Sequence, residues 1–326
     1  MNIYRIKTNI YNEVTIAGRT LSRIQDYYIP NIVDIKSENE IVDADFYALI
    51  RDDTPLLTSR IISLAKSRAK QNNAPIKIGS GVVTKKDFTI EPIAYRSPLC
   101  TVFSPQNYAF ILNTINKRIL SYHKSNGVYI MDNSTFIDLD VNIECGACIR
   151  PRVTLSGKTV IHKNALISEN SHIINSTIGQ NTVVLSSYII DSKVGENSSV
   201  GPYAVIQKGA SIGNNCRIGD FVEIKNSILK DNVKSAHLTY VGDALVGNNV
   251  NLGCGTVFCN YDGKQKHRTT VGDNVFVGAN TNLIAPIIIG SHSFIAAGTT
   301  VTKNIQPNSF CISRSPLQVS DLQRNW

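Results

Sequence analysis

Residues 143–173 read IECGACIRPRVTLSGKTVIHKNALISENSHI, and every sixth residue of this stretch is isoleucine or leucine. The same spacing of aliphatic residues returns at residues 194–224 and 271–301. An amphipathic α-helix would repeat its apolar residues about every 3.6 positions, and a half-buried strand every second position. A period of six is instead typical of a coil with three short strands per turn, in which one aliphatic side chain of each strand points inward.

Stacking such coils would bury a continuous aliphatic column, while backbone groups pair with the coils above and below. The sequence therefore predicts a mainly β protein, a left-handed parallel β-helix of hexapeptide repeats. The residues expected to point inward are Ile143, Ile149, Leu155, Ile161, Ile167, Ile173, Ile178, Val184, Val194, Val200, Ile206, Ile212, Ile218, Ile224, Val246, Leu252, Phe258, Val271, Val277, Leu283, Ile289, Ile295 and Val301.

Glycine often follows the inward residue, as at Gly179, Gly195 and Gly213. We attribute these glycines to corners of the coil that require unusual backbone angles, which glycine or asparagine can adopt. The ladder breaks at residues 229–245 and again at 259–270, and both breaks are expected to be inserted loops. Loops on a rigid scaffold commonly carry functional groups.

Residues 1–125 show no six-residue period and are expected to form a small α/β domain, followed by the β-helix domain at 126–326. The pattern predicts helices at 59–71 and 105–123 and strands at 46–50 and 75–78. No glycine-rich phosphate loop opens a helix here, because Gly79-Ser80-Gly81 stands alone.

Charge and composition exclude several classes of function. The formal charge is +8, but lysines and arginines are dispersed, so we expect no nucleic-acid partner. No apolar run is long enough to span a membrane, and the N-terminus lacks a secretory signal, so a cytoplasmic protein is expected. The seven cysteines are an odd number and suggest reduced thiols. Cys145 and Cys148 form one C-x-x-C with no second pair of ligands at suitable spacing, so no metal is expected.

A set of motifs near the second half of the coil carries a family resemblance. These are Lys234-Ser-Ala-His237-Leu-Thr-Tyr240-Val-Gly-Asp243, then Asn251-Leu-Gly-Cys254-Gly-Thr, and Cys259-Asn260-Tyr261-Asp262-Gly263. They resemble the acetyltransferase domain of the bifunctional bacterial enzyme that makes UDP-N-acetylglucosamine. That enzyme joins a glucosamine-1-phosphate N-acetyltransferase to an N-acetylglucosamine-1-phosphate uridylyltransferase. The resemblance covers roughly residues 100–320.

The resemblance implies an acetyl-CoA-dependent N-acetyltransferase, a homotrimer, acting on glucosamine 1-phosphate for UDP-N-acetylglucosamine and cell-wall synthesis. His237 matches the catalytic histidine, and imidazole titrates near neutral pH as a general base should. Glu223 is expected to orient His237 as a neighbouring carboxylate. Matches to the family's acceptor contacts are Lys225, Tyr240, Asn251 and Lys266. Matches to its acetyl-CoA contacts are Cys254, Asn260, Tyr261, Ala279, Ala297 and Arg314, with the Asn260 amide as a possible oxyanion donor.

Two departures from the family matter. Gln207 stands where the family places an arginine that contacts the sugar phosphate. The resemblance therefore does not decide which amino sugar is the acceptor. In residues 1–125, Asp53 matches a magnesium-binding aspartate, but the nucleotide loop is absent and Phe103 falls at the second magnesium ligand. A truncated domain that has lost uridylyl transfer is therefore expected. The alternatives are an N-acetyltransferase for another amino sugar, and a non-catalytic trimeric paralogue that binds sugar nucleotide or CoA.

Overall fold

The computed structural model divides the chain into two compact units. One is Met1–Tyr122 with Ile137–Leu139, and the other is His123–Phe136 with Asp140–Trp326. The structure describes residues 1–6, 15–16, 19–36, 40–41, 46–51, 54–78, 81–84, 92–94, 105–314, 317 and 319. Asp53 and Phe103 lie outside these residues, so their predicted relation to magnesium stays a prediction. Within the described residues, no helix is both long enough and apolar enough to cross a membrane.

The first unit is built on a mixed sheet in the order β4-β1-β5-β7-β6-β8. Its strands are β1 (Asn2–Ile6), β4 (Ile32–Ile35), β5 (Tyr47–Arg51), β6 (Ile76–Ile78), β7 (Gly81–Thr84) and β8 (Ile93–Ala94), beside a hairpin of β2 (Thr15–Ile16) and β3 (Arg19–Thr20). Its helices are α1 (Leu21–Tyr28), α2 (Ser59–Asn72) and α3 (Pro105–Ser125), the last of which runs on to the coil. The predicted helices at 59–71 and 105–123 and the two predicted strands are confirmed.

Both faces of this sheet are covered by apolar side chains. Ile62, Ala65 and Ala69 of α2 pack against Ile76 and Ile78 in one cluster. The Thr58 side chain caps the start of α2 by accepting a hydrogen bond from the Ile61 amide. On the other face Tyr4 and Leu49 lie in a second, smaller cluster.

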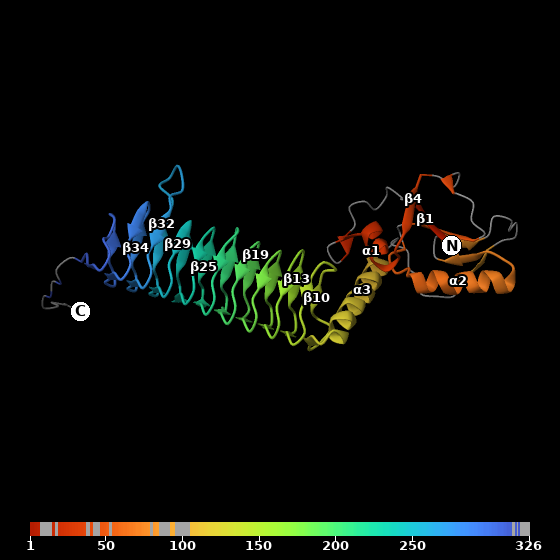
Figure 1. Ribbon diagram of the computed structural model, residues 1–326, viewed down its shortest axis with the longest axis horizontal. Helices are drawn as coiled ribbons and strands as arrows, with labels where there is room; N and C mark the ends of the chain where they lie inside the picture. The colour runs from red at the N-terminus through yellow and green to blue at the C-terminus, as the bar shows by residue number, and fades with distance from the viewer. Residues whose placement is uncertain are drawn as a thin grey trace, which may run out of the picture. The chain divides into compact units, whose positions relative to one another are not determined.

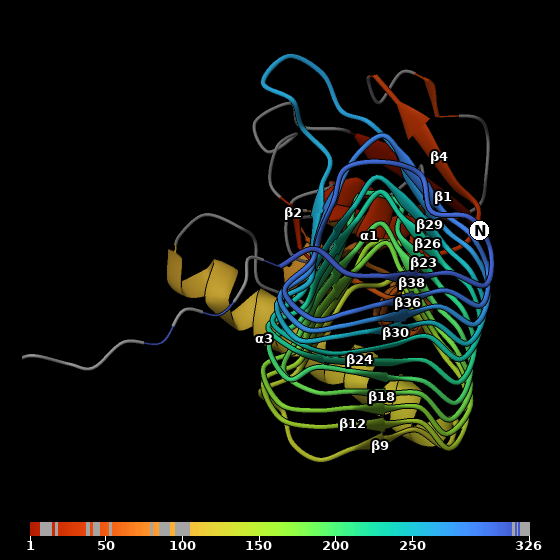
Figure 2. The ribbon, with the colours of Figure 1, turned by 90° about the vertical axis from the view of Figure 1, so that its left-hand side faces the viewer.

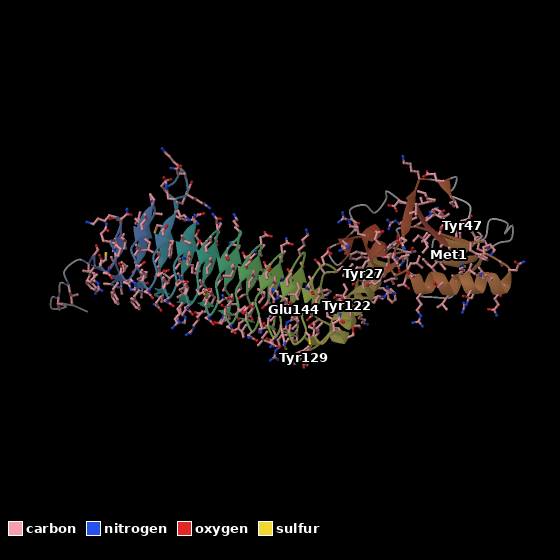
Figure 3. All side chains as sticks on the ribbon, in the orientation of Figure 1. Met1, Tyr27, Tyr47, Tyr122, Tyr129 and Glu144 are labelled. Carbon is pink, nitrogen blue, oxygen red and sulfur yellow. The ribbon has the colours of Figure 1, made fainter. Side chains whose placement is uncertain are left out.

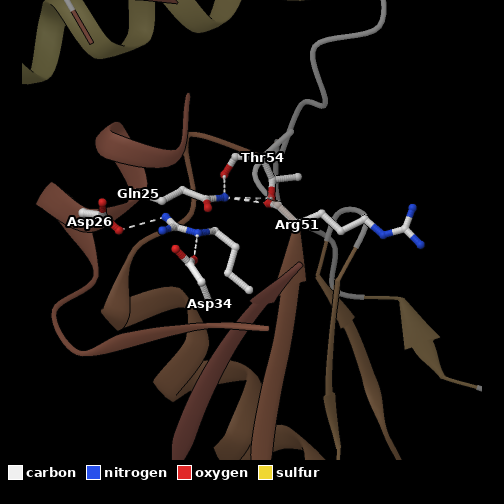
Figure 4. A network of polar contacts seen from close by, with 6 residues as sticks. Gln25, Asp26, Asp34, Arg51 and Thr54 are labelled. Atoms are coloured by element: carbon white, nitrogen blue, oxygen red, sulfur yellow. Dashed lines mark hydrogen bonds and ion pairs between the residues drawn. The ribbon is translucent and has the colours of Figure 1, made fainter. Parts of the chain in front are cut away.

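Two polar networks tie the strands of the first unit to α1 (Figure 4). Arg5 is 3% exposed and pairs with Asp26 at 2.8 Å and with Asp34 at 2.7 Å. The Gln25 amide nitrogen donates to the carbonyl oxygens of Arg51 and Thr54, 2.6 and 3.2 Å away. Gln25 therefore holds the chain where it leaves β5, because one side chain satisfies two backbone acceptors.

The second unit is a three-sided coil whose strands pair in parallel from one coil to the next. Figure 1 shows the coils stacked along the axis, and Figure 2 shows the three faces as the sides of a triangle. The ten-stranded face holds β10 (Phe136–Ile137), β13 (Thr154–Ser156), β16 (His172–Ile174), β19 (Tyr188–Ile190), β22 (Val205–Gln207), β25 (Glu223–Lys225), β28 (Tyr240–Gly242), β31 (Val257–Cys259), β34 (Asn282–Ile284) and β37 (Thr300–Val301).

The two other faces complete the triangle. The nine-stranded face holds β11 (Asn142–Ile143), β14 (Val160–Ile161), β17 (Thr177–Ile178), β20 (Lys193–Val194), β23 (Ser211–Ile212), β26 (Ile228–Leu229), β29 (Ala244–Val246), β32 (Thr269–Val271) and β35 (Ile287–Ile289). The eleven-stranded face holds β9 (Tyr129–Ile130), β12 (Cys148–Ile149), β15 (Leu166–Ile167), β18 (Val183–Val184), β21 (Ser199–Val200), β24 (Arg217–Asp220), β27 (Lys234–His237), β30 (Asn251–Leu252), β33 (Phe276–Val277), β36 (Phe294–Ile295) and β38 (Phe310–Cys311).

The predicted hexapeptide β-helix is confirmed. Every residue of the predicted aliphatic ladder, from Ile143 to Val301, is buried inside the coil. Outward residues are exposed or half-buried, as Tyr129 and Glu144 show at the first coils (Figure 3). The fold follows because three short strands per coil place every sixth side chain in a common apolar interior.

The prediction of an inserted loop at residues 229–245 was wrong. This segment forms regular coil, with Leu229, Ser235 and Val241 at the inward positions. The pattern escaped detection because Ser235 is polar although it is fully buried, and because the steps from Ile224 to Leu229 and from Val241 to Val246 are five residues. A corner that is one residue shorter shifts the period without interrupting the stacking of the strands.

The ladder glycines do not have the predicted role. Gly179 and Gly195 do not have positive φ, and they are required instead because a Cβ atom on either would meet the backbone of the next coil. Asparagines such as Asn181 and Asn197 occupy many of the left-handed corners, and glycines outside the ladder, such as Gly146 and Gly209, occupy several others. Asn181 donates from its side-chain amide to Asn197 at 3.1 Å, so adjacent corners also bond to each other.

The second predicted loop, at 259–270, is confirmed. It leaves the coil between β31 and β32 and projects outward from the apex where the ten- and nine-stranded faces meet (Figure 2). Tyr261 and Lys266 form an antiparallel bridge within it. We call this apex the loop edge, and the segment between β31 and β32 the projecting loop.

Candidate active site

The edge between the eleven- and ten-stranded faces carries His237 and three of the residues matched to acetyl-CoA contacts. Each of these residues lies two positions after an inward residue of the eleven-stranded face, so they stack coil upon coil in the order Asp220, His237, Cys254, Ala279 and Ala297. Backbone bonds join successive coils here, for example from Leu238 N to Asp220 O at 3.0 Å and from Asn280 N to Cys254 O at 2.8 Å. We call this column the His237 edge.

His237 is half-exposed and has one polar side-chain neighbour. Its Nδ1 lies 2.5 Å from Asp220 Oδ1, with the side chains 51% and 33% exposed. A carboxylate only accepts hydrogen bonds, so this contact favours the tautomer with the proton on Nδ1, which leaves the lone pair of Nε2 to accept another proton. The arrangement can therefore act as a general base at Nε2.

Glu223, predicted to orient His237, makes a different contact. Its Oε1 accepts a hydrogen bond from Gln207 Nε2 at 2.9 Å. Strand register places Glu223 beside Tyr240 and Gln207 beside Lys225 on the ten-stranded face. The carboxylate that contacts His237 belongs to Asp220, a residue that the sequence motifs did not single out. Only the pairing of β24 with β27 reveals it.

Asn260 lies at the loop edge and is almost completely buried. Its Nδ2 donates to Asp243 Oδ2 at 2.5 Å and lies 3.5 Å from the Tyr240 hydroxyl oxygen, while Asp243 Oδ1 accepts from Asn226 at 2.5 Å. The Asn260 amide is thus engaged by Asp243 and lies near the Tyr240 hydroxyl. Its predicted use as an oxyanion donor stays a prediction, and it would require one of these bonds to break.

The projecting loop presents Tyr261 and Lys266 to solvent, and an internal cap holds it in shape. Asp262 accepts hydrogen bonds from the Lys264 and Gln265 amides, both at 2.8 Å, and pairs with His267 Nε2 at 2.7 Å. Hydrogen bonds from the Gln265 amide, from His267 and from the Lys264 amide hold the pKa of Asp262 well below its usual range. Protonation therefore disrupts the cap only at strongly acidic pH, because a depressed pKa preserves the ionised form as the pH falls.

The predicted site residues fall into separate groups in one protomer. His237, Cys254, Ala279 and Ala297 share the His237 edge, whereas Asn260, Tyr261 and Lys266 lie at the loop edge. Glu223, Lys225 and Tyr240 lie on the face between them. Asn251 lies on the eleven-stranded face between Lys234 and Phe276, and Arg314 is exposed just beyond β38.

The cysteines and histidines form no metal centre in the part of the chain that the structure describes: no three His, Cys, Asp or Glu side chains there are grouped to hold an ion. Cys145, Cys148 and Cys254 are among the free thiols.

Solved structures with detectable likeness include two UDP-N-acetylglucosamine acyltransferases. The enzyme from Campylobacter jejuni is 22% identical, with a TM-score of 0.37 over 53% of this chain and 69% of that chain. The enzyme from Arabidopsis is 18% identical, with a TM-score of 0.37 over 55% of this chain and 67% of that chain. Likeness at this level carries no argument about function.

Sequence comparison is more informative. Residues 191–226 and 268–303 match the family described as bacterial transferase hexapeptide (six repeats). The bifunctional protein GlmU of Clostridioides difficile is 50% identical over 201 residues, which are 61% of this chain and 44% of that protein. GlmU of Clostridium acetobutylicum is 47% identical over 208 residues, 64% of this chain and 46% of that protein. The chain thus spans less than half the length of these relatives, and over some 200 residues it is a homologue of the bifunctional GlmU proteins.

Proposed function

We propose that the coil transfers the acetyl group of acetyl-CoA to the amine of an amino-sugar phosphate, glucosamine 1-phosphate first among them. The observation that carries the proposal is His237, which has a free Nε2 and stands on the same edge as Cys254, Ala279 and Ala297. Identity of 50% to GlmU over 201 residues supports it. The product would feed UDP-N-acetylglucosamine and cell-wall synthesis.

The chemistry requires a base at the amine. As the acceptor nitrogen attacks the thioester carbonyl, Nε2 of His237 takes the proton that the nitrogen must lose, and the thiolate of CoA leaves. A positioned imidazole contributes about 10²- to 10⁴-fold to such a step. Acetyl-CoA would lie along the His237 edge, with Arg314 beside its phosphates because guanidinium suits phosphate oxygens.

The acceptor would lie on the ten-stranded face beside His237. Lys225 supplies a cation for the sugar phosphate, and Glu223 retains Oε2 to accept from a sugar hydroxyl. Gln207 adds no charge, and its amide already donates to Glu223. The phosphate is consequently held by fewer charges than an arginine at this position would provide.

We further propose a homotrimer with each site at a cleft between protomers. The His237 edge and the loop edge border opposite sides of the ten-stranded face, and the projecting loop points away from the coil (Figure 2). Lys266 and Tyr261 would thus reach a neighbour's His237 edge more readily than their own. In a cyclic trimer every site is completed in the same way.

Sedimentation equilibrium tests this assembly. We expect a single species of three times the mass of 35.8 kDa at micromolar concentration. A stable monomer that transfers acetyl groups would refute the shared site.

An amino-sugar panel tests the activity. The full chain is mixed with acetyl-CoA and glucosamine 1-phosphate, glucosamine or another amino-sugar phosphate, and free thiol is measured. We expect release to be fastest with glucosamine 1-phosphate. We expect no pyrophosphate from UTP and N-acetylglucosamine 1-phosphate with Mg²⁺, because no glycine-rich phosphate loop opens a helix in residues 1–125. If no acceptor gives thiol release, the protein is instead a non-catalytic paralogue that binds sugar nucleotide or CoA.

Gln207→Arg separates the two enzyme alternatives. Restoring a charge-assisted contact, worth about 1.5–3 kcal/mol, should lower the Michaelis constant for glucosamine 1-phosphate about tenfold or more. Gln207→Glu is the matched control, because it places the opposite charge at the same position and should raise that constant. If Gln207→Arg abolishes activity on the best acceptor, that acceptor carries no phosphate there, and another amino sugar becomes the substrate.

A further inference from the structure

The contact between His237 and Asp220 arises from the way the backbones of β24 and β27 pair. Most strands of the eleven-stranded face are two residues long, but β24 and β27 each have four. Their pairing continues to the corner and sets Asp220 directly opposite His237. Gly219 permits this, because a Cβ atom there would collide with the Ala236 carbonyl oxygen of the next coil.

The carboxylate that the sequence predicted for this role, Glu223, makes a different contact. Glu223 is drawn toward Gln207 by a hydrogen bond of 2.9 Å, whereas Asp220 lies 2.5 Å from His237 Nδ1. The Asp220 backbone carbonyl also accepts from Leu238 N at 3.0 Å, so strand pairing and side chains both hold the two residues together.

We propose that Asp220 is the positioning residue of His237. It holds the proton on Nδ1, leaves the lone pair on Nε2 and fixes the ring against the corner of the coil. Glu223 is thereby released to bind the acceptor together with Gln207. The inference rests on the proposed acetyl transfer for its catalytic meaning, but the tautomer that it predicts exists with or without turnover.

Nitrogen NMR of the imidazole tests the tautomer without any assay of activity. The full chain is labelled with ¹⁵N-histidine at a pH where His237 is neutral, and His237→Gln identifies its signals among the six histidines. We expect the protonated-nitrogen shift at Nδ1 in the wild type and a move to the Nε2-protonated form in Asp220→Ala. Glu223→Gln should leave the tautomer unchanged. A wild-type His237 protonated at Nε2, or a tautomer that changes with Glu223→Gln and not with Asp220→Ala, would overturn the proposal.

Steady-state kinetics provide a second test of the role of Asp220. Partners that orient a metal-bound histidine are worth about 10- to 100-fold, and we expect a loss of similar size here. Asp220→Ala should lower kcat by that factor, while the Michaelis constant for acetyl-CoA changes less than about twofold. Asp220→Asn should recover part of the loss, since its amide oxygen can still accept from Nδ1. Equal losses in both variants with correct circular dichroism, or a loss confined to acetyl-CoA binding, would contradict positioning.

The chain provides a matched control. Glu144 Oε1 lies 2.9 Å from His162 Nδ1, the same kind of pair about four coils earlier, roughly 19 Å along the axis at 4.8 Å per coil. Glu144→Gln should change neither kcat nor the His237 signals. If the wild type shows the predicted tautomer but transfers no acetyl group, the proposed function fails while the Asp220 contact stands.

Discussion

His237→Ala should lower the turnover of acetyl transfer by about 10²- to 10⁴-fold and leave acetyl-CoA binding almost unchanged. The reason is that His237 offers a proton-accepting Nε2, whereas the predicted acetyl-CoA contacts lie in the following coils, at Cys254, Ala279 and Ala297. Steady-state kinetics gives kcat, and calorimetric titration gives the dissociation constant for acetyl-CoA.

His162→Ala is the control for this experiment, since His162 also faces a carboxylate but lies far from the predicted site. It should retain full turnover. Full activity of His237→Ala would show that another group accepts the amine proton. A parallel loss of acetyl-CoA binding would show that His237 belongs to the cofactor site.

Phe258→Ala should destabilise the coil by about 3–5 kcal/mol. Phe258 is fully buried, and it is the largest of the fully buried side chains. It occupies the inward position next to Leu283 of the following coil, just before the projecting loop. Truncation leaves a cavity that the neighbouring coils cannot fill, because their backbones are held by parallel pairing.

Urea unfolding at a fixed protein concentration measures this loss. Phe310→Ala is the control: its ring is 66% exposed and stacks on Phe294 at 5.7 Å, so its truncation should cost about 1.5 kcal/mol or less. Equal destabilisation by both substitutions would mean that the inward column does not dominate the stability of the coil.

Much of the fold could be predicted because it depends on a local repeat. Every residue of the predicted ladder is buried, and α2 and α3 begin at the predicted residues, Ser59 and Pro105. The prediction failed at residues 229–245, where a buried Ser235 and two five-residue steps between inward residues concealed three regular strands. The single five-residue step from Ile173 to Ile178 did not hide the period, but a polar inward residue between two five-residue steps did.

The candidate site was predicted less completely. Resemblance to the family motifs singled out His237 and the residues that the structure places on the same edge. They assigned the orienting carboxylate to Glu223, whereas the carboxylate that contacts His237 is Asp220. Residues 17 positions apart become neighbours only when one coil stacks on the next.

The amino-acid sequence by itself therefore determined the solenoid, its inward column, the projecting loop and the histidine proposed as base. The first three depend on residue type and short spacing, and the histidine was singled out by its resemblance to a family motif. Only the tertiary structure decided the contacts between coils: Asp220 with His237, Gln207 with Glu223, and Asn260 with Asp243. The physical reason is that such contacts depend on strand register and corner length. A shift of one residue at a corner changes which side chains meet, although the apolar pattern along the chain stays almost the same.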